Sequence, residues 1–253
     1  MTTASLEYKI SARPSPLLSQ LPKSKPSVLG ITLARGGSKG VPRKNIREVA
    51  GKPLLAWTVE VALECSAIDQ YVVSSEDDKI LDMARQLGAQ GVRRPVELSA
   101  DETPSLDALI HALNWAEDFY NTTFEIVADL RNTNPLKTVQ DIYGAICKLI
   151  DTEADAVIGV TQLEDHHPRR IKMLWNDCLV DVWPEESGNR QELTPDCYIR
   201  NGSIYAVWAE CLRRGILFNR SQNLRPWVMP LERSINVDTE LDLKMVDLLL
   251  KER

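Results

Sequence analysis

The stretch VLGITLARGGSKGVPRKN, residues 28–45, runs from an apolar segment directly into a cationic loop. Residues 28–34 have the short, continuous apolar pattern of a buried strand. The loop contains three glycines, which let a backbone approach a ligand closely, and four basic side chains, which bind phosphate oxygens. The basic residues are Arg35, Lys39, Arg43 and Lys44. Because open parallel sheets bind ligands where strands end, the loop is predicted to hold a polyphosphate.

The loop differs from the two common phosphate-binding motifs. It has neither the Gly-x-x-x-x-Gly-Lys-Ser/Thr spacing of a P-loop nor the Gly-x-Gly-x-x-Gly spacing of a dinucleotide site. ATPase and dinucleotide-binding functions are therefore disfavoured. The alternative is a surface loop with solvated charges, and the preceding apolar strand argues against it.

Composition limits the remaining possibilities. The chain has 253 residues, enough for one large α/β domain, and a formal net charge of −6, which argues against a nucleic-acid partner. Its five cysteines show no Cys-x-x-Cys spacing and indicate reduced thiols. No apolar run is long enough to span a bilayer, and no signal peptide is evident. These features predict a soluble, cytoplasmic protein.

Apolar strand-like segments alternate with helical patterns after residue 26, which predicts an α/β fold with a mostly parallel sheet. Residues 1–26 are rich in proline and show no periodicity, so we expect a flexible extension before a single domain at 27–253. Residues 164–200 break the alternation and are predicted to be an excursion that gates a site or pairs with another subunit. The expected strands are 28–34, 71–74, 124–130, 156–160, 203–208 and 227–229. The expected helices are 53–65, 76–87, 104–118, 138–150 and one from 239 onward.

Several ordered stretches together resemble the acylneuraminate cytidylyltransferases. They are ARGGSKGVPRKN (34–45), GKPL (51–54), VVSS (72–75), RPVEL (94–98), DETPS (101–105), NGSIY (201–205) and VDTELD (237–242). The resemblance implies a Rossmann-like nucleotidyltransferase fold with a smaller dimerisation and sugar-site excursion, and a homodimer. It also implies the Mg²⁺-dependent reaction of CTP with a nonulosonic (sialic acid-like) sugar to give a CMP-sugar and pyrophosphate.

The resemblance also implies roles for individual residues. Arg35, Lys39 and Asp238 match catalytic positions. Nucleotide-binding positions are matched by Leu33, Ala34, Arg35, Gly36, Gly37, Ser38, Lys39, Asn45, Arg94 and Ser105. For Arg94 the alternative is a surface ion pair with Glu97, and for Ser105 it is a hydroxyl in the first turn of a helix.

Asp238 matches a metal-binding aspartate of the family and is the main candidate ligand for Mg²⁺. The alternative is that Asp238 caps the final helix. The family usually has a second aspartate two residues earlier, where this chain has Asn236. An amide oxygen there still faces the metal but brings no charge.

The largest departure lies at residues 129–138, DLRNTNPLKT, where the family typically has a glutamine at the position of Arg131. An arginine there can pair with a carboxylate or a phosphate, so we expect Arg131 to contact substrate. Three roles are open for Asp129. It could hold Arg131 in place for the substrate, it could be a ligand of the metal, or it could form a purely structural ion pair with Arg131.

Further residues resemble family positions around the sugar: Arg170, Arg190 and Gln191. The neighbouring His166 and His167 lack the spacing of a zinc site, and loop packing or a dimer contact is the simpler interpretation.

Two alternatives to CTP-dependent activation of a nonulosonic acid remain open. One is a related transferase that uses GTP or a Kdo-like sugar. The other is a catalytically silent nucleotide-binding protein, for which Asn236 and the altered strand end at Arg131 are the motivation.

Overall fold

The computed structural model describes residues 25–38, 40–100, 102–184, 189, 192–216 and 223–253. The chain folds around a seven-stranded sheet in the order β11-β7-β10-β6-β1-β4-β5. Only β10 runs antiparallel to its two neighbours. The predicted α/β fold with a mostly parallel sheet is therefore confirmed. The strands of this sheet are β1 (Val28–Leu33), β4 (Gln70–Ser75), β5 (Gln90–Arg93), β6 (Ile126–Leu130), β7 (Ala156–Gln162), β10 (Tyr198–Trp208) and β11 (Leu224–Val228).

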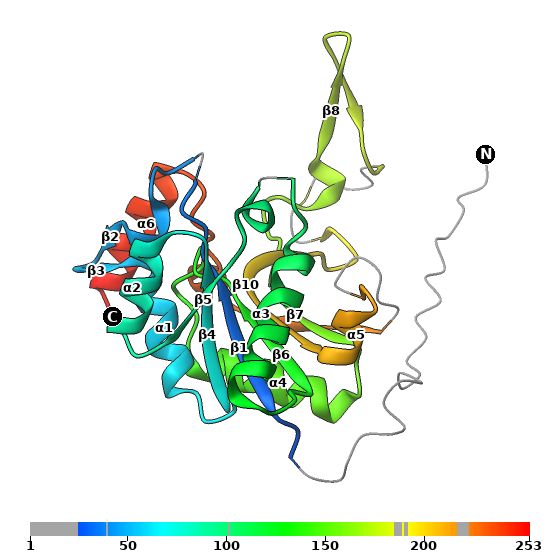
Figure 1. The fold of residues 1–253 in the computed structure, drawn as a ribbon. Helices are drawn as coiled ribbons and strands as arrows, with labels where there is room; N and C mark the ends of the chain where they lie inside the picture. The colour runs from blue at the N-terminus through cyan, green and yellow to red at the C-terminus, as the bar shows by residue number, and fades with distance from the viewer. Residues whose placement is uncertain (1–24, 39, 101, 185–188, 190–191, 217–222) are drawn as a thin grey trace.

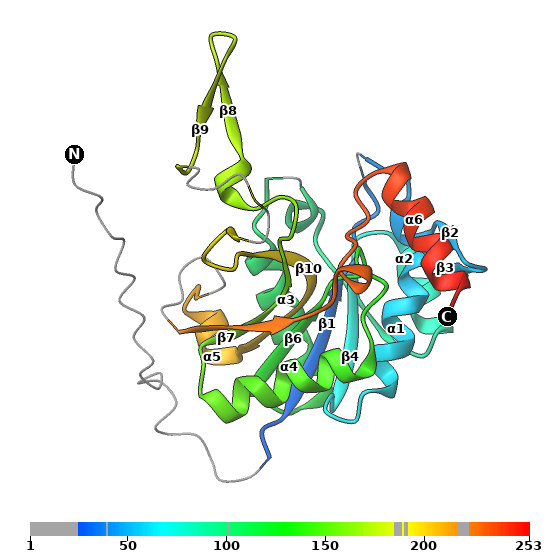
Figure 2. The same ribbon diagram turned by 180° about the vertical axis from the view of Figure 1, so that it is seen from behind.

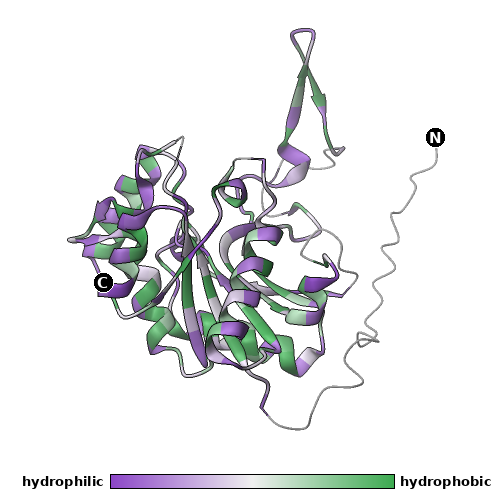
Figure 3. Ribbon diagram, in the orientation of Figure 1, coloured by the Kyte–Doolittle hydropathy of each residue, from purple (hydrophilic) through white to green (hydrophobic). Residues whose placement is uncertain are grey.

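Helices cover both faces of the sheet. Figure 1 shows α3 (Ser105–Tyr120) in front, close to α5 (Ala209–Arg213). The opposite view in Figure 2 brings α1 (Leu54–Glu64) and α4 (Val139–Thr152) to the front. The helix α2 (Asp78–Gln86) packs beside β4 and β5. The two-sided cover explains why β1 and β6 are mostly apolar and almost completely buried. Figure 3 shows hydrophobic residues, in green, along much of the central strands.

Polar side chains cap the N-terminus of three helices. Asp77 accepts hydrogen bonds from two backbone amides at the start of α2. Thr138 caps α4, and Thr239 caps the last helix, α6 (Glu240–Lys251), each in a capping box. The interpretation of Asp238 as the cap of this helix is wrong, because Thr239 occupies that position. The carboxylate of Asp238 is thus available for another role.

Two small sheets lie outside the central one. β2 (Glu48–Val49) pairs with β3 (Lys52–Pro53) beside α6. β8 (Lys172–Trp175) and β9 (Cys178–Asp181) form a hairpin that projects from the body in both views. This hairpin is the central part of the excursion expected at 164–200. Short 3₁₀ turns are η2 (Lys44–Ile46), η3 (Val96–Ser99), η4 (Pro168–Arg170) and η6 (Leu231–Arg233).

Several expected boundaries are wrong. β5 and the β2–β3 pair were not expected, since each is very short. β10 begins at Tyr198 rather than 203, and β11 ends before residue 229.

All five cysteines are free thiols. Within the described residues, no helix combines the length and apolar character needed to cross a membrane.

Candidate active site

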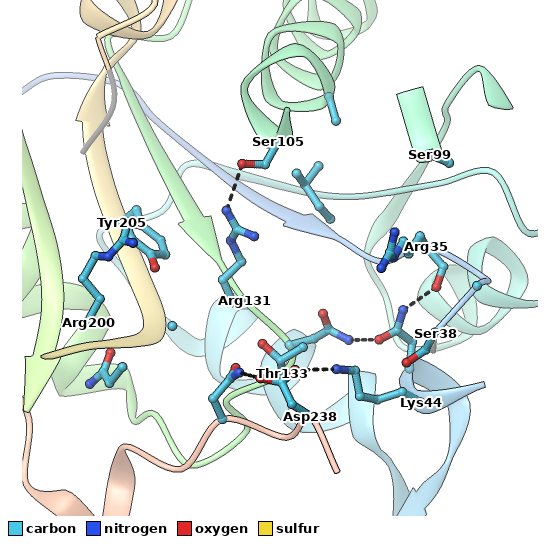
Figure 4. Close-up of a pocket in the computed structure, with 18 of the residues that line it drawn as sticks. Arg35, Ser38, Lys44, Ser99, Ser105, Arg131, Thr133, Arg200, Tyr205 and Asp238 are labelled. Atoms are coloured by element: carbon cyan, nitrogen blue, oxygen red, sulfur yellow. Dashed lines mark hydrogen bonds and ion pairs between the residues drawn. The ribbon is translucent and has the colours of Figure 1, made fainter. Parts of the chain in front are cut away.

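A cavity of about 850 Å³ opens at the edge of the sheet where β1 and β6 end (Figure 4). These strands are parallel neighbours, so their carboxyl ends deliver the two following loops to one place. The start of α3, part of β10 and the segment before α6 complete the wall. Ten of the residues predicted from sequence line this cavity: Leu33, Arg35, Gly37, Ser38, Asn45, Arg94, Ser105, Arg131, Asn236 and Asp238.

The remaining predicted residues divide into two groups. Ala34 and Gly36 belong to the loop after β1 without lining the cavity, and Arg170 lies outside it, exposed and 3.9 Å from Asp165. The other three lie outside the described residues: Lys39, Arg190 and Gln191.

The loop after β1 is anchored at both ends. Its Gly36 amide donates to Oε1 of Glu76 over 2.6 Å. A side chain at Gly40 would collide with the backbone carbonyl of Asp238. Glycine is therefore required at residue 40, because the loop touches the segment before α6. The cationic loop and Asp238 consequently meet in one cavity although they are about two hundred residues apart in sequence.

Asn45 connects this loop to the loop after β6. Its amide nitrogen donates to the carbonyl of Arg35 over 2.6 Å, and its oxygen accepts from Asn132 over 2.5 Å. Both asparagines are buried. A hydrogen-bonded pair of buried amides resists displacement, since an unmade bond there leaves a desolvated polar group. The two loops are thus held in a fixed relation.

Asp238 lies beside a cation and an amide. Its Oδ1 is 3.2 Å from the Lys44 ammonium, and its Oδ2 accepts a hydrogen bond from Asn236. The described residues contain no group of three or more His, Cys, Asp or Glu side chains that could hold a metal by themselves. Mg²⁺ is commonly bound through one or two carboxylates together with substrate phosphates and water. The single exposed carboxylate of Asp238 fits that kind of binding and does not fit an all-protein metal cage.

Arg94 enters the cavity from the strand end of β5. It is buried and forms its ion pair with Glu76 at 3.1 Å, so the alternative pairing with Glu97 is wrong. Ser99 also donates to Glu76, over 2.9 Å. Burial opposes the charge of Glu76, but hydrogen bonds from the backbone, Ser99 and Arg94 hold its pKa below the usual value. One carboxylate therefore orients both the cationic loop and Arg94.

Arg131 follows β6 and forms an ion pair with Asp129 at 2.7 Å. It also donates to Oγ of Ser105, the first residue of α3, over 3.2 Å. Asp129 is buried, does not line the cavity and is therefore not part of a metal shell with Asp238. Burial raises the pKa of Asp129, although Arg131 and Lys137 oppose the shift.

Sequence reasoning missed several residues that line the cavity. Arg200 and Tyr205 come from β10, and Thr133 from the loop after β6. The NGSIY stretch pointed to this region, but only the antiparallel insertion of β10 beside β6 brings Arg200 to the site. Lys44 is predicted only as one of the four phosphate-binding charges of the loop, and it lines the cavity. Among the described residues, the charged lining consists of one acid, Asp238, and these bases: Arg35, Lys44, Arg94, Arg131 and Arg200.

The histidines have no part in this cavity. His167 is buried, and its Nε2 lies 2.9 Å from the carbonyl of Pro195. His166 is exposed, and His111 lies on α3. Loop packing is confirmed for His167.

The fold and the cavity define a class of α/β protein. In it, the cationic loop after β1 and the carboxylate of Asp238, just before α6, line the same cavity. A family model described as cytidylyltransferase matches residues 29–172, more than half of the chain. The chain belongs to this cytidylyltransferase family, which confirms the resemblance seen in the sequence.

Similar proteins from Campylobacter jejuni span nearly the whole chain. Pseudaminic acid cytidylyltransferase is 28% identical over 225 residues, covering 88% of this chain and 96% of that protein. CMP-N,N'-diacetyllegionaminic acid synthase is 28% identical over 225 residues, with 88% and 94% covered. A solved structure of CMP:2-keto-3-deoxy-manno-octonic acid synthetase complexed with CTP gives a TM-score of 0.66 at 17% identity, with 89% and 99% covered. The last similarity supports the fold.

Proposed function

We propose that this protein transfers CMP from CTP to the anomeric hydroxyl of a nonulosonic acid and releases pyrophosphate. One observation carries the proposal: the cationic loop, Asp238 and the guanidinium of Arg131 line a single cavity. The cytidylyltransferase family supports CTP as the nucleotide. The two Campylobacter relatives are named for two different nonulosonic acids, which supports this sugar class and leaves the particular sugar open.

The chain contributes mainly positioning and positive charge. The sugar hydroxyl attacks the α-phosphorus in line and gives up its proton to the solvent, and the bond to the pyrophosphate oxygen breaks. We assign Arg35, Ser38 and Lys44, which all line the cavity, to binding of the triphosphate, and we expect the cations to stabilise the negative charge that develops on the leaving group. We assign the same role to Lys39 from its place in the sequence motif. Arg94 is our candidate for the cytidine side of the cavity, whereas Ser105, matched to a nucleotide-binding position by the resemblance, accepts a hydrogen bond from Arg131.

We propose Mg²⁺ as the cofactor. When bound, it would neutralise phosphate charge and polarise the phosphoryl group. Asp238 would hold it through its carboxylate, with Asn236 as a neutral neighbour on the same segment. The nearby Lys44 ammonium balances the carboxylate of Asp238 at 3.2 Å.

We further propose a homodimer formed through the β8–β9 hairpin. Leu174 and Leu179 are paired across this hairpin and are exposed by 72% and 73%. Figure 3 shows apolar segments on this arm, away from the rest of the molecule. Apolar surface of this kind marks an interaction site.

Arg170 precedes the hairpin, and we propose Arg170, Arg190 and Gln191 as sugar contacts supplied from this region.

Pyrophosphate release tests the function directly. CTP and GTP are each combined with pseudaminic, N,N'-diacetyllegionaminic, N-acetylneuraminic and Kdo acids, with Mg²⁺ present. We expect release with CTP and a nonulosonic acid and much less with GTP or with Kdo. Tight CTP binding without release for any acid would instead favour the silent nucleotide-binding protein.

We place the reaction in the cytoplasm, which the free thiols support.

A further inference from the structure

Three described neighbours hold the guanidinium of Arg131. Its Nε donates to Oδ2 of Asp129 over 2.7 Å, and its Nη2 donates to Oγ of Ser105 over 3.2 Å. The ring centre of Tyr205 lies 5.3 Å from the guanidinium carbon. Figure 4 shows this side chain standing between Arg200 and Tyr205 on one side and Arg35 on the other. The guanidinium is therefore fixed at the middle of the cavity.

The backbone explains this arrangement. Asp129 and Arg131 are two residues apart at the end of β6, so their side chains lie on the same face. Tyr205 pairs with Asp129 in the ladder between β6 and β10. The amide of Arg131 continues that ladder by donating to the carbonyl of Ser203 over 3.0 Å. The sheet and the start of α3 thus set the orientation of Arg131.

Asp129 does not line the cavity and contacts it through Arg131. It is 1% exposed, and its Oδ1 has no hydrogen-bond partner among the described residues. A buried ion pair commonly stabilises a fold no more than an apolar pair of similar size. Its presence under the cavity therefore indicates a role in orienting the arginine.

The guanidinium has a second edge that remains available. Nε and Nη2 are used by Asp129 and Ser105, and within the described parts of the chain no acceptor contacts Nη1. Arg131 lines the cavity, where described basic side chains outnumber the single acid. The Nη1–Nη2 edge is the fork that binds a carboxylate with two parallel hydrogen bonds.

We propose that Asp129 and Ser105 lock Arg131 as the receptor for the carboxylate of the sugar acid, with Asp129 as its positioning residue. This inference rests on the proposed function, because the carboxylate belongs to the 2-keto acid sugar. In such a sugar the carboxylate is bonded to the anomeric carbon. Fixing it at Arg131 therefore holds the anomeric carbon next to Arg131, in the cavity that Arg35 also lines.

The test is the discrimination between each sugar acid and its C1 carboxamide. Binding to the CDP-saturated protein is measured by calorimetry with N-acetylneuraminic, N,N'-diacetyllegionaminic and pseudaminic acids and their amides. We expect the wild type to prefer at least one acid about ten- to hundredfold. Arg131→Gln should abolish this preference, and Asp129→Asn should reduce it, while CDP affinity stays within about twofold. Arg35→Gln is the matched control and should weaken CDP binding but keep the acid preference.

A double variant separates positioning from stability. Arg131→Gln leaves Asp129 buried and unpaired, so Asp129→Leu/Arg131→Gln, which removes both charges, should melt at a higher temperature than Arg131→Gln alone. It should also lack the acid preference. Equal binding of acid and amide by the wild type, or an acid preference that survives Arg131→Gln, overturns the proposal. Failure to release pyrophosphate with every acid counts against the proposed function instead, because the binding ratio does not depend on turnover.

Discussion

At the scale of single residues, the arginines of the cavity differ in how they are held. Arg94 and Arg131 are each fixed by an acid that does not line the cavity, Glu76 and Asp129 respectively. Fixing a cation in advance reduces the ordering cost when the ligand binds. Each of these two ion pairs therefore fixes the position of an arginine before an anionic ligand binds.

Arg35 is predicted to act mainly in turnover. Arg35→Gln should lower kcat by roughly a hundred- to a thousandfold, since it removes charge from the place where the leaving group becomes negative. Steady-state kinetics with CTP measures this effect, and the melting temperature should remain near that of the wild type. Arg43→Gln is the control from the same loop, because Arg43 is half-exposed, pairs with Asp77 and does not line the cavity. Equal losses in the two variants would contradict a specific role for Arg35.

Asn236 is predicted to weaken metal binding. Asn236→Asp places a second carboxylate against Asp238 and should destabilise the metal-free protein by like-charge repulsion. It should also lower the Mg²⁺ concentration for half-maximal effect several-fold. The melting temperature with and without Mg²⁺ and CTP reports both effects. A variant with unchanged Mg²⁺ dependence would show that this position does not face the metal.

Lys137 is predicted to make stability depend on pH. It is fully buried, and its ammonium donates to Thr58, to the carbonyl of Arg131 and to that of Asn134. Burial lowers its pKa to about 7, against the attraction of buried carboxylates. Above this pKa the folded protein releases a proton that the unfolded chain retains, so this group makes stability increase with pH from about 7 toward 10 and has no effect on the slope below 7.

Denaturant unfolding between pH 6 and 9 tests this prediction. The unfolding free energy of the wild type relative to Lys137→Met should rise above pH 7, by at most about 1.4 kcal/mol per pH unit. A difference that is constant over this range would show that Lys137 stays charged in the folded protein.

At the scale of elements, the β8–β9 hairpin is predicted to carry self-association. Leu174→Glu/Leu179→Glu should shift the protein to monomer in sedimentation or light-scattering experiments. The monomer should remain folded, since both side chains are exposed in the single chain, and should lose only the stabilisation that association supplies. Leu248→Glu on α6 replaces another exposed leucine and should leave the dimer intact. A monomeric wild type at high protein concentration would rule out this role.

Elements differ in how well their sequences specify them. The apolar run of β1 and the capping boxes of α4 and α6 are local signals. The bounds predicted for β1 and α4, and the start predicted for α6, lie close to those observed. β5 has four residues, and β2 and β3 have two each. Segments this short are strands because of their hydrogen-bonded neighbours, so no local pattern could have identified them.

At the scale of the whole molecule, the sheet order brings distant segments together. β1 lies beside both β4 and β6, and β10 lies between β6 and β7. The loops that follow β1 and β6, the part of β10 where its register with β7 shifts between Arg200 and Tyr205, and the segment before α6 therefore meet at one edge. Contact between Gly40 and Asp238 is one direct consequence.

The sequence by itself determined the cationic loop, the α/β class, the family and ten of the residues that line the cavity, because strand patterns, caps and motifs are local. Tertiary structure decided the rest. It assigned Glu76 rather than Glu97 to Arg94, placed Arg200 in the site and left Arg170 outside. These outcomes depend on which strands become neighbours and on which charges are buried together, and both are settled only when the sheet is assembled.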